Sequence, residues 1–410
     1  MTTKINNEHK KVYVPNLRFP EFHGEWEKQK LCDISSIVGR IGFRGYTTND
    51  IVDKGMGAIA LSPTNIVNNQ LTYDKDNTYI SMSKYEESPE IMIKRGDVIF
   101  VKTGSTVGKV AYVDKMICKT TLNPQVVVLK DIKCDNYILS VIMSTRNFQN
   151  KIQRITVGGA VPTLSQVAMG NIFISLPAAK EQEKISKFIS LLDERISTQN
   201  KIIEDLKKLK CAIIEKHYRQ AKLHKYKICD LGVPFSVGSL SKEDLSEEGH
   251  ECILYGELFT TYDCVINEVK SHTNKIANTT LSQKGDLLFP SSTTVDAVSL
   301  ISPSVIDTPN VILGGDMFGI HIDKKFNAYY LSYYINLIAR KKLAIYAKGS
   351  TIIHLHYKDI AKAQLLLPDL CEQDKIAKCM MAEDAKINVE EQLLTKLEKQ
   401  KQYLLRQMFI

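Results

Sequence analysis

The stretch Pro177-Ala-Ala-Lys-Glu-Gln-Glu-Lys-Ile185 occurs a second time, in altered form, as Pro368-Asp-Leu-Cys-Glu-Gln-Asp-Lys-Ile376. Each copy opens a segment without glycine or proline, residues 178–231 and 369–410. In both segments the apolar residues recur at alternating spacings of three and four, which is typical of the buried seam of a coiled coil. We therefore predict two long helices that are related by a shift of 191 residues, and hence an internal duplication.

The predicted seam contains apolar positions from both helices. They are Ile189, Leu192, Ile196, Ile203 and Leu206 in the first helix, and Met380, Ile387, Leu394, Leu397 and Leu404 in the second. The first helix leads into the second half of the chain, where the second helix begins, so pairing between them is expected to be antiparallel. Polar residues also occupy seam positions and can fix the register. We expect Lys210 to reach Glu383 or Glu390.

The regions before the two helices resemble each other in element order, which predicts an α+β protein with two similar mixed α/β domains joined by an antiparallel coiled coil. Asp97-Val-Ile-Phe100 is matched by Asp286-Leu-Leu-Phe289, and one helix is expected over residues 136–154 and another over residues 328–344. The predicted division is a lead-in segment (1–22), a first domain (23–178), a first spacer helix (179–222), a second domain (223–369) and a second spacer helix (370–410).

Composition is that of an ordinary globular chain: 44% of the 410 residues are hydrophobic, 24% are charged, and the formal net charge is +8. This modest positive charge favours a polyanionic partner over an acidic small substrate. The nine cysteines are dispersed without a CxxC pair, which indicates reduced thiols and a cytoplasmic location. The sequence shows neither a signal sequence nor an apolar run of about 18 residues, so no membrane association is expected.

Several resemblances to catalytic or ligand-binding motifs fail in detail. The run Gly104-Ser-Thr-Val-Gly-Lys109 lacks the first glycine of a phosphate-binding loop and has valine where Mg²⁺ coordination requires Ser or Thr. His354 and His356 lack neighbouring cysteines or carboxylates, so a structural role is expected rather than a metal site. The sequence therefore predicts no catalytic residues, no metal and no cofactor bound by this chain.

Two α+β domains, each ending in a Gly-x-[Ala/Thr]-[Val/Ile] loop and a Pro-x-x-x-Glu-Gln-x-x-Ile helix start, resemble the specificity subunit of type I restriction-modification enzymes. The loops begin at Gly158-Gly159 and at Gly349, and the resemblance covers nearly the whole chain. It implies that each domain is a target-recognition domain for one half of a bipartite sequence in double-stranded DNA, with the helices setting the gap. It further implies two methyltransferase subunits carrying S-adenosylmethionine and two motor-nuclease subunits using ATP and Mg²⁺, which methylate adenine and restrict DNA.

If the chain reads DNA, basic and polar loop residues are the expected contacts, because Lys and Arg bind phosphates while polar side chains distinguish base edges. In the first domain the candidates are Arg40, Arg44, Tyr46, Lys102, Thr103, Ser105, Lys109, Gly158 and Gly159. In the second domain they are Ser291, Thr293, Thr294, Lys348, Ser350, Thr351 and His354, with Ser292 in the same turn.

A second interpretation from another class of protein stays open at this point. The chain would be a scaffold whose coiled coil bridges two adaptor domains that bind proteins and no nucleic acid. Salt dependence separates the two interpretations, because only phosphate binding predicts an affinity for DNA that falls steeply with ionic strength.

Overall fold

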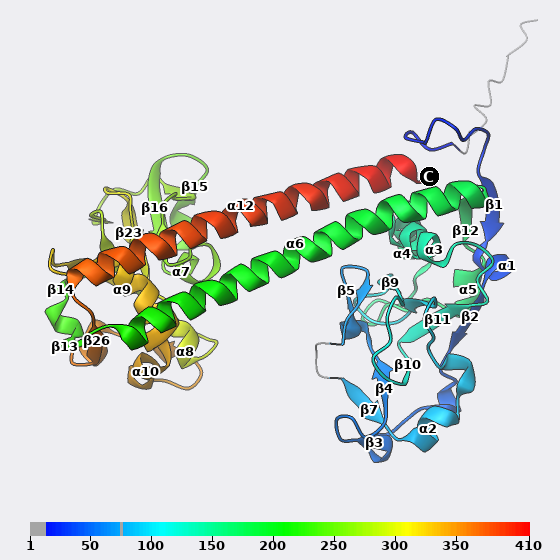
Figure 1. The fold of residues 1–410 in the computed structure, drawn as a ribbon, viewed down its shortest axis with the longest axis horizontal. Coiled ribbons are helices and arrows are strands. Elements are labelled where there is room, and N and C mark those ends of the chain that lie inside the picture. The colour runs from blue at the N-terminus through cyan, green and yellow to red at the C-terminus, as the bar shows by residue number, and fades with distance from the viewer. Residues whose placement is uncertain (1–13, 74–76) are drawn as a thin grey trace, which may run out of the picture. The chain divides into compact units, whose positions relative to one another are not determined.

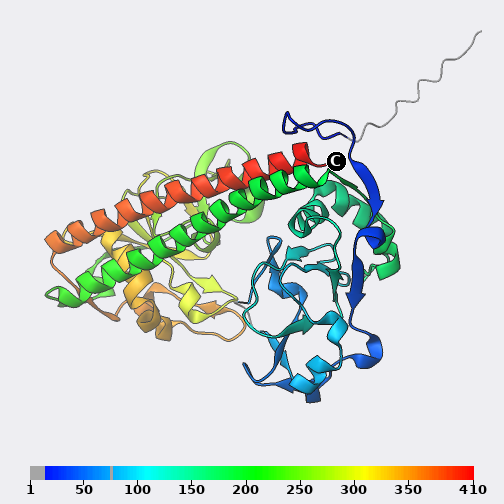
Figure 2. The same ribbon diagram turned by 45° about the vertical axis from the view of Figure 1, so that its right-hand side comes forward.

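The computed structural model describes residues 14–73 and 77–410, and these fall into two compact units. Unit 1 extends to Thr198 and includes Leu394–Ile410, and unit 2 is Gln199–Leu393. Residues 1–13 of the predicted lead-in segment lie outside the described residues. We call the parts of units 1 and 2 other than the two long helices domain 1 and domain 2 (Figures 1 and 2).

Domain 1 is a mixture of short strands and helices. Its strands are β1 (Glu27–Lys30), β2 (Ser36–Gly39), β3 (Ile51–Val52), β4 (Ala58–Leu61), β5 (Ile66–Val67), β6 (Gln70–Leu71), β7 (Thr78–Ile80), β8 (Val98–Val101), β9 (Val110–Tyr112), β10 (Thr120–Leu122), β11 (Val126–Lys130) and β12 (Phe173–Leu176). Its helices are α1 (Leu31–Ile34), α2 (Met82–Glu86), α3 (Asn136–Ser144), α4 (Arg146–Ile155) and α5 (Gln166–Gly170), and the first long helix is α6 (Ala179–Gln220).

Domain 2 has a comparable set of elements. Its strands are β13 (His224–Lys227), β14 (Gly232–Ser236), β15 (Leu245–Ser246), β16 (His250–Leu254), β17 (Val265–Ile266), β18 (Ser271–Thr273), β19 (Thr280–Leu281), β20 (Asp286–Pro290), β21 (Ser292–Thr293), β22 (Ser304–Ile306), β23 (Ile312–Gly314), β24 (Met317–Ile322), β25 (Ile353–His354) and β26 (Gln364–Leu367). Its helices are α7 (Glu257–Thr260), α8 (Ala297–Leu300), α9 (Ala328–Tyr334), α10 (Arg340–Leu343) and α11 (Tyr357–Ile360), and the second long helix is α12 (Leu370–Met408).

The sheets of the two domains share one frame. In domain 1 the antiparallel order β2-β11-β8-β9 forms part of a six-stranded mixed sheet, and in domain 2 the antiparallel order β14-β24-β20-β22 repeats it within a five-stranded mixed sheet. The parallel pair β4 and β10 is matched by β16 and β23. Antiparallel pairs close each domain, β1 with β12 and β13 with β26. This agreement in strand order confirms the predicted duplication and the α+β class.

Buried strands separate two cores in domain 1, because successive side chains of a strand point to opposite faces. On β8, Val98 and Phe100 pack with helices α3 and α4, whereas Ile99 and Val101 pack with the sheet that contains β4 and β10. The same alternation occurs on β20, where Leu287 and Phe289 face the helices. The sheet is therefore covered by helices on one face and by a second sheet on the other.

The helices α6 and α12 run side by side and antiparallel within each unit (Figures 1 and 2). In unit 2, Gln199 binds the side chain of Glu390 at 2.5 Å, while the later Lys210 binds the earlier Asp384. In unit 1, Lys401 binds Asp193. All ten predicted seam residues are buried or half-buried, which confirms the seam and the direction of pairing.

A tyrosine-aspartate-lysine contact joins the helix pair to the domain of each unit. In unit 2, Tyr333 of the α9 helix donates a hydrogen bond to Asp384 at 2.5 Å, and Asp384 also binds Lys210 of the opposite long helix. In unit 1, Tyr137 of α3 donates to Asp193 at 2.7 Å, and Lys401 completes the contact. The carboxylate and the lysine are both shifted by 191 residues between the copies. Each carboxylate therefore ties a domain to both long helices.

The repeated Glu-Gln at each helix start has one shared role and one different role. Gln182 accepts a hydrogen bond from the Asp135 backbone, and Gln373 accepts one from the Asn327 backbone. Both glutamines therefore attach the helix start to the N-cap residue of a domain helix. Glu181 differs from its counterpart, since its fully buried carboxylate binds Arg18 through two hydrogen bonds of 2.7 Å.

Two expectations were wrong in detail. Lys210 binds Asp384 rather than Glu383 or Glu390, because Asp384 is the carboxylate that Tyr333 holds beside it. The helix expected over residues 136–154 is interrupted at Thr145, whose extended backbone ends α3 and whose hydroxyl accepts a hydrogen bond from the Phe148 amide at the start of α4.

We predict that Tyr333→Phe lowers the free energy of unfolding by about 1–2 kcal/mol, because it removes a hydrogen bond to a charged, largely desolvated acceptor while preserving the ring. Urea unfolding of the full chain measures the change. Tyr403→Phe is the matched control, since Tyr403 lies on α12 with 60% of its surface exposed. Equal stability of the Tyr333→Phe variant and the parent chain would contradict the assigned contact.

Candidate nucleic-acid interface

In domain 1 the structure brings together two of the predicted loops, the turn after β8 and the loop that contains Gly158. The Leu164 amide donates to the Lys102 carbonyl at 2.8 Å, and the Gly104 amide donates to the Pro162 carbonyl at 2.9 Å. The loop closes on itself through reciprocal backbone bonds between Val157 and Thr163. We call this junction, residues 102–105 with 157–164, the domain 1 junction.

Domain 2 builds the same junction from different side chains. The Leu355 amide donates to the Ser291 carbonyl at 2.8 Å, and reciprocal backbone bonds join Lys348 with His354. The short strand β21 pairs with β25, which sets Ser292 opposite His354. We call residues 291–294 with 348–355 the domain 2 junction. The predicted candidates Ser291, Thr293, Thr294, Lys348, Ser350, Thr351 and His354 all belong to it.

Glycine is required at one position of each loop. Gly158 has φ +98° and Gly349 has φ +123°, in the left-handed region that side chains disfavour. A Cβ at Gly158 would also lie 2.7 Å from the Val161 carbonyl oxygen, and one at Gly349 would clash with the Ile352 carbonyl. The Gly-x-[Ala/Thr]-[Val/Ile] signature therefore encodes a tight backbone reversal that presents the loop at the surface.

Charged groups surround the domain 2 junction. Lys348 is exposed and binds the Asp359 carboxylate at 2.6 Å. This hydrogen bond holds the pKa of Asp359 below its ordinary value. Lys348, His354 and Asp359 line an open cavity of about 530 Å³, and Asp316 also lines it.

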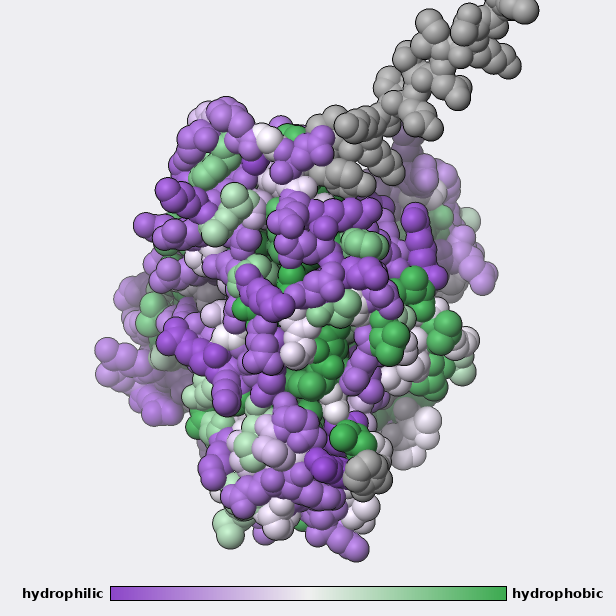
Figure 3. Space-filling view, turned by 90° about the vertical axis from the view of Figure 1, so that its right-hand side faces the viewer, coloured by the Kyte–Doolittle hydropathy of each residue, from purple (hydrophilic) through white to green (hydrophobic). Residues whose placement is uncertain are grey.

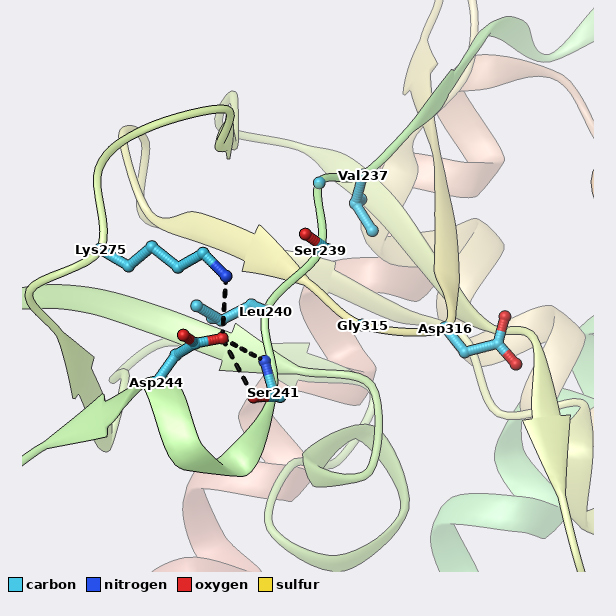
Figure 4. Close-up of a pocket in the computed structure, with 9 residues that line it drawn as sticks. Val237, Ser239, Leu240, Ser241, Asp244, Lys275, Gly315 and Asp316 are labelled. Carbon is cyan, nitrogen blue, oxygen red and sulfur yellow. Dashed lines mark hydrogen bonds and ion pairs between the residues drawn. The ribbon is translucent and has the colours of Figure 1, made fainter.

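Asp316 also lines a neighbouring cavity of about 580 Å³. Across it from Asp316, Lys275 binds Asp244 at 3.0 Å, and Asp244 also accepts a hydrogen bond from the Ser241 amide (Figure 4). Asp316 is therefore placed between two hollows of the domain 2 surface.

The other candidates in domain 1 are placed less favourably for DNA contact. Arg40 is buried, and its guanidinium donates to the Leu122 carbonyl at 2.9 Å and to Thr121 Oγ1 at 3.0 Å, so it holds the domain together. Arg44 binds Glu90 at 3.4 Å. The Tyr46 hydroxyl accepts a hydrogen bond from Asn123.

Lys109 is exposed and donates to the Ile66 carbonyl at 3.3 Å. Lys102, Thr103, Ser105, Gly158 and Gly159 meet at the domain 1 junction, whereas Arg40, Arg44 and Tyr46 gather at a separate place. Figure 3 shows a face of the molecule that is mainly hydrophilic, with apolar side chains gathered near its centre.

Sequence reasoning missed two residues at these junctions. The Lys102 amide donates to the Gln125 carbonyl at 2.9 Å, and the Ser291 amide donates to the Asp316 carbonyl at 2.7 Å. Gln125 and Asp316 are themselves related by the repeat shift of 191 residues. That shift was the signal that could have paired them from the sequence.

Neither a metal cluster nor a membrane span is found in the described part of the chain. Residues 14–73 and 77–410 contain no group of three or more His, Cys, Asp or Glu side chains arranged to hold a metal ion. The same residues form no helix that is both long and apolar enough to cross a bilayer.

The rings of His354 and His356 stack on each other, with 6.1 Å between their centroids.

The family model described as "Type I restriction modification DNA specificity domain" matches the chain twice, over residues 23–208 and 222–399. The chain belongs to this family. It is thus a specificity subunit of the type I restriction-modification class, with a role in DNA sequence recognition, and its two matched regions correspond to the duplication.

Relatives of the specificity subunit agree with this assignment. The putative type I restriction enzyme MjaX specificity subunit of Methanocaldococcus jannaschii is 24% identical over 413 residues, covering 94% of this chain and 93% of the relative. The type I restriction enzyme MjaVIII specificity subunit of the same organism is 24% identical over 344 residues, covering 77% of this chain and 79% of the relative.

Solved structures share the fold. The crystal structure of the type I restriction-modification S subunit from M. genitalium matches with a TM-score of 0.58 and 14% identity, covering 97% of this chain and 99% of that one. A chain from a structural study of complex assembly and conformational transition of the type I system matches with a TM-score of 0.53 and 15% identity, covering 93% and 96%.

We predict that Lys348→Met raises the pKa of Asp359 toward its ordinary value, because the variant loses the hydrogen bond that stabilises the carboxylate. In the parent chain this depressed pKa adds stability that is present above the ordinary pKa and is lost as the pH falls through the folded value. NMR titration of the side-chain carboxyl measures the shift. Lys358→Met, at the rim of the same cavity, should leave the Asp359 titration unchanged; identical titration curves in the Lys348→Met variant and the parent would contradict the pairing.

Proposed function

We propose that this chain is the non-catalytic sequence-recognition subunit of a type I restriction-modification complex, and that each domain reads one half of a bipartite DNA target. The observation that supports this most is the duplicated junction. Two domains with a shared strand order present the same backbone turn and glycine loop, yet the exposed residues differ, as with Gly159 and Ser350. Identical frames with different side chains suit two different half-sequences.

In this proposal the helix pair sets the gap between the half-targets. Within each unit a lysine-aspartate contact pairs α6 with α12, which supports a fixed register for the helix pair. About 40 residues of helix span roughly 60 Å at 1.5 Å per residue.

The partners in this proposal supply the chemistry. Two methyltransferase subunits carry S-adenosylmethionine and modify adenine, and two motor-nuclease subunits use ATP and Mg²⁺ to restrict unmodified DNA. The chain itself binds none of these cofactors and directs its partners by where it docks on the duplex. Affinity comes mainly from phosphate contacts, whereas base selection comes from the junction side chains.

Mapping of modified adenines in a cell with and without this chain tests the proposal. We expect two short motifs, joined by a fixed unspecified gap, to carry modified adenine when the chain is present and to lose it when the chain is deleted. Restoring the parent chain should restore both motifs. A methylation pattern that is the same in both strains, with the partner methyltransferase expressed, would exclude the proposed function.

We predict that Lys102→Met and Lys348→Met each reduce the slope of log affinity against log salt by about 1, since each removes one phosphate contact and the counterion released with it. The measurement is DNA binding by the complex with the methyltransferase at several salt concentrations. Lys324→Met is the matched control because Lys324 is exposed and lies just beyond the opposite end of β24 from the junction. Slopes unchanged in both junction variants would show that these lysines do not contact phosphate.

A further inference from the structure

Gln125 and Asp316 occupy equivalent positions in the two domains. Each is the residue immediately before a buried strand, β11 or β24, that pairs antiparallel with β8 or β20. Each carbonyl accepts a hydrogen bond from the first residue of the junction turn, Lys102 or Ser291. The backbone therefore fixes where both side chains leave the domain surface, on the edge of the turn opposite the glycine loop.

Both side chains are accessible there. Gln125 is exposed, and among the described residues its side-chain amide has no hydrogen-bond partner. Asp316 has 43% of its side chain exposed and lies where the two cavities of domain 2 meet. Neither side chain is needed for packing, which leaves both available to a ligand.

Asp316 is also poorly neutralised by its own domain. Lys275 is paired with Asp244 and Lys348 with Asp359. The ion-pair contact of Asp316 in the described structure is with His354, whose Nδ1 lies 3.9 Å from the carboxylate and which carries charge only when protonated. A carboxylate beside DNA phosphates is repelled by them, and hydrogen bonds accepted from a base can offset this repulsion. Among base edges in the major groove, the cytosine N4 amino group is the donor that suits Asp, while a Gln amide suits adenine through N6 and N7.

We propose that Gln125 and Asp316 are specificity-determining residues, Gln125 selecting an adenine in one half-target and Asp316 selecting a cytosine in the other. This inference rests on the proposed function and goes beyond it by naming one base and one reader in each half. The repeat thus places an amide and a carboxylate at the same point of the same frame. The difference between the two half-sequences at that point follows from the different hydrogen-bonding patterns of these two groups.

The test is the target sequence methylated by the complex of the full chain with its methyltransferase partner, read from a library of randomised DNA. Asp316→Asn should lower the preference for cytosine at one position by about tenfold and favour adenine there, because an amide both donates and accepts. Gln125→Glu should shift one position of the other half from adenine toward cytosine. In each variant the remaining positions and the other half should stay as in the parent.

Asp323→Asn is the matched control, since Asp323 is exposed, carries the same charge and directly follows β24, whereas Asp316 directly precedes it. This control should leave the target unchanged. An unaltered target in both junction variants, or a uniform loss of methylation across all sequences, would overturn the inference. A parent chain without any sequence preference would instead overturn the proposed function, so the two failures are distinguishable.

Discussion

The arrangement of the long helices depends on a carboxylate that binds a lysine of the opposite helix and a tyrosine of a domain. Asp193 and Asp384 each make this contact, and each is largely removed from solvent, with 19% and 25% of the side chain exposed. Separating such a carboxylate from its partners leaves charge in a poorly solvated place, which is costly. A slip of the helices by one turn would break both contacts at once. The duplicated pair therefore selects one register among those that the apolar seam alone would tolerate.

The junctions show how one frame serves two domains. Backbone hydrogen bonds define the turn, the glycine loop and the strand that follows, so apart from the required Gly158 and Gly349 these features tolerate different side chains. Side chains at the surface of this frame can then differ without disturbing the core, because the alternating residues of β8 and β20 carry the packing. In these segments the backbone and the buried side chains determine the fold, whereas the exposed side chains are available for recognition.

Much of this could be read from the sequence, because period and repetition are local properties. The seam and the antiparallel pairing follow from the spacing of Ile189, Leu192 and the other apolar residues of the two helices. The two related domains follow from the constant shift of 191 residues between repeated motifs. Side-chain partners could not be read in the same way. The heptad pattern of the second helix places three acidic residues within possible reach of Lys210, namely Glu383, Asp384 and Glu390. The hydrogen bond from Tyr333 holds Asp384 beside Lys210 and so decides among them.

Surface candidates were harder still, because a basic residue in a glycine-rich loop carries no signal of its burial. The charge of Arg40 predicts a phosphate contact, yet its guanidinium donates hydrogen bonds to Leu122 and Thr121 inside domain 1. Asp316 carries the opposite charge from the one expected at a DNA surface, so its residue type does not predict a DNA contact. Its place in the frame, beside Ser291, becomes visible only once strand pairing is known.

The ion pair between Arg18 and Glu181 attaches the N-terminal segment to the start of the first long helix. The polar composition of that segment does not predict this structural role. Glu181 is fully buried and pairs with Arg18, because Lys184 one turn away pairs with Glu21 instead, whereas its counterpart Glu372 is 39% exposed and pairs with Lys375 one turn away. Proteolytic trimming past residue 18 would thus remove the ion-pair partner of this carboxylate and destabilise the first helix start. The two helix starts of the duplication therefore differ in their dependence on other segments. Glu181 pairs with an arginine far away in the sequence, whereas Glu372 pairs with a lysine of its own helix.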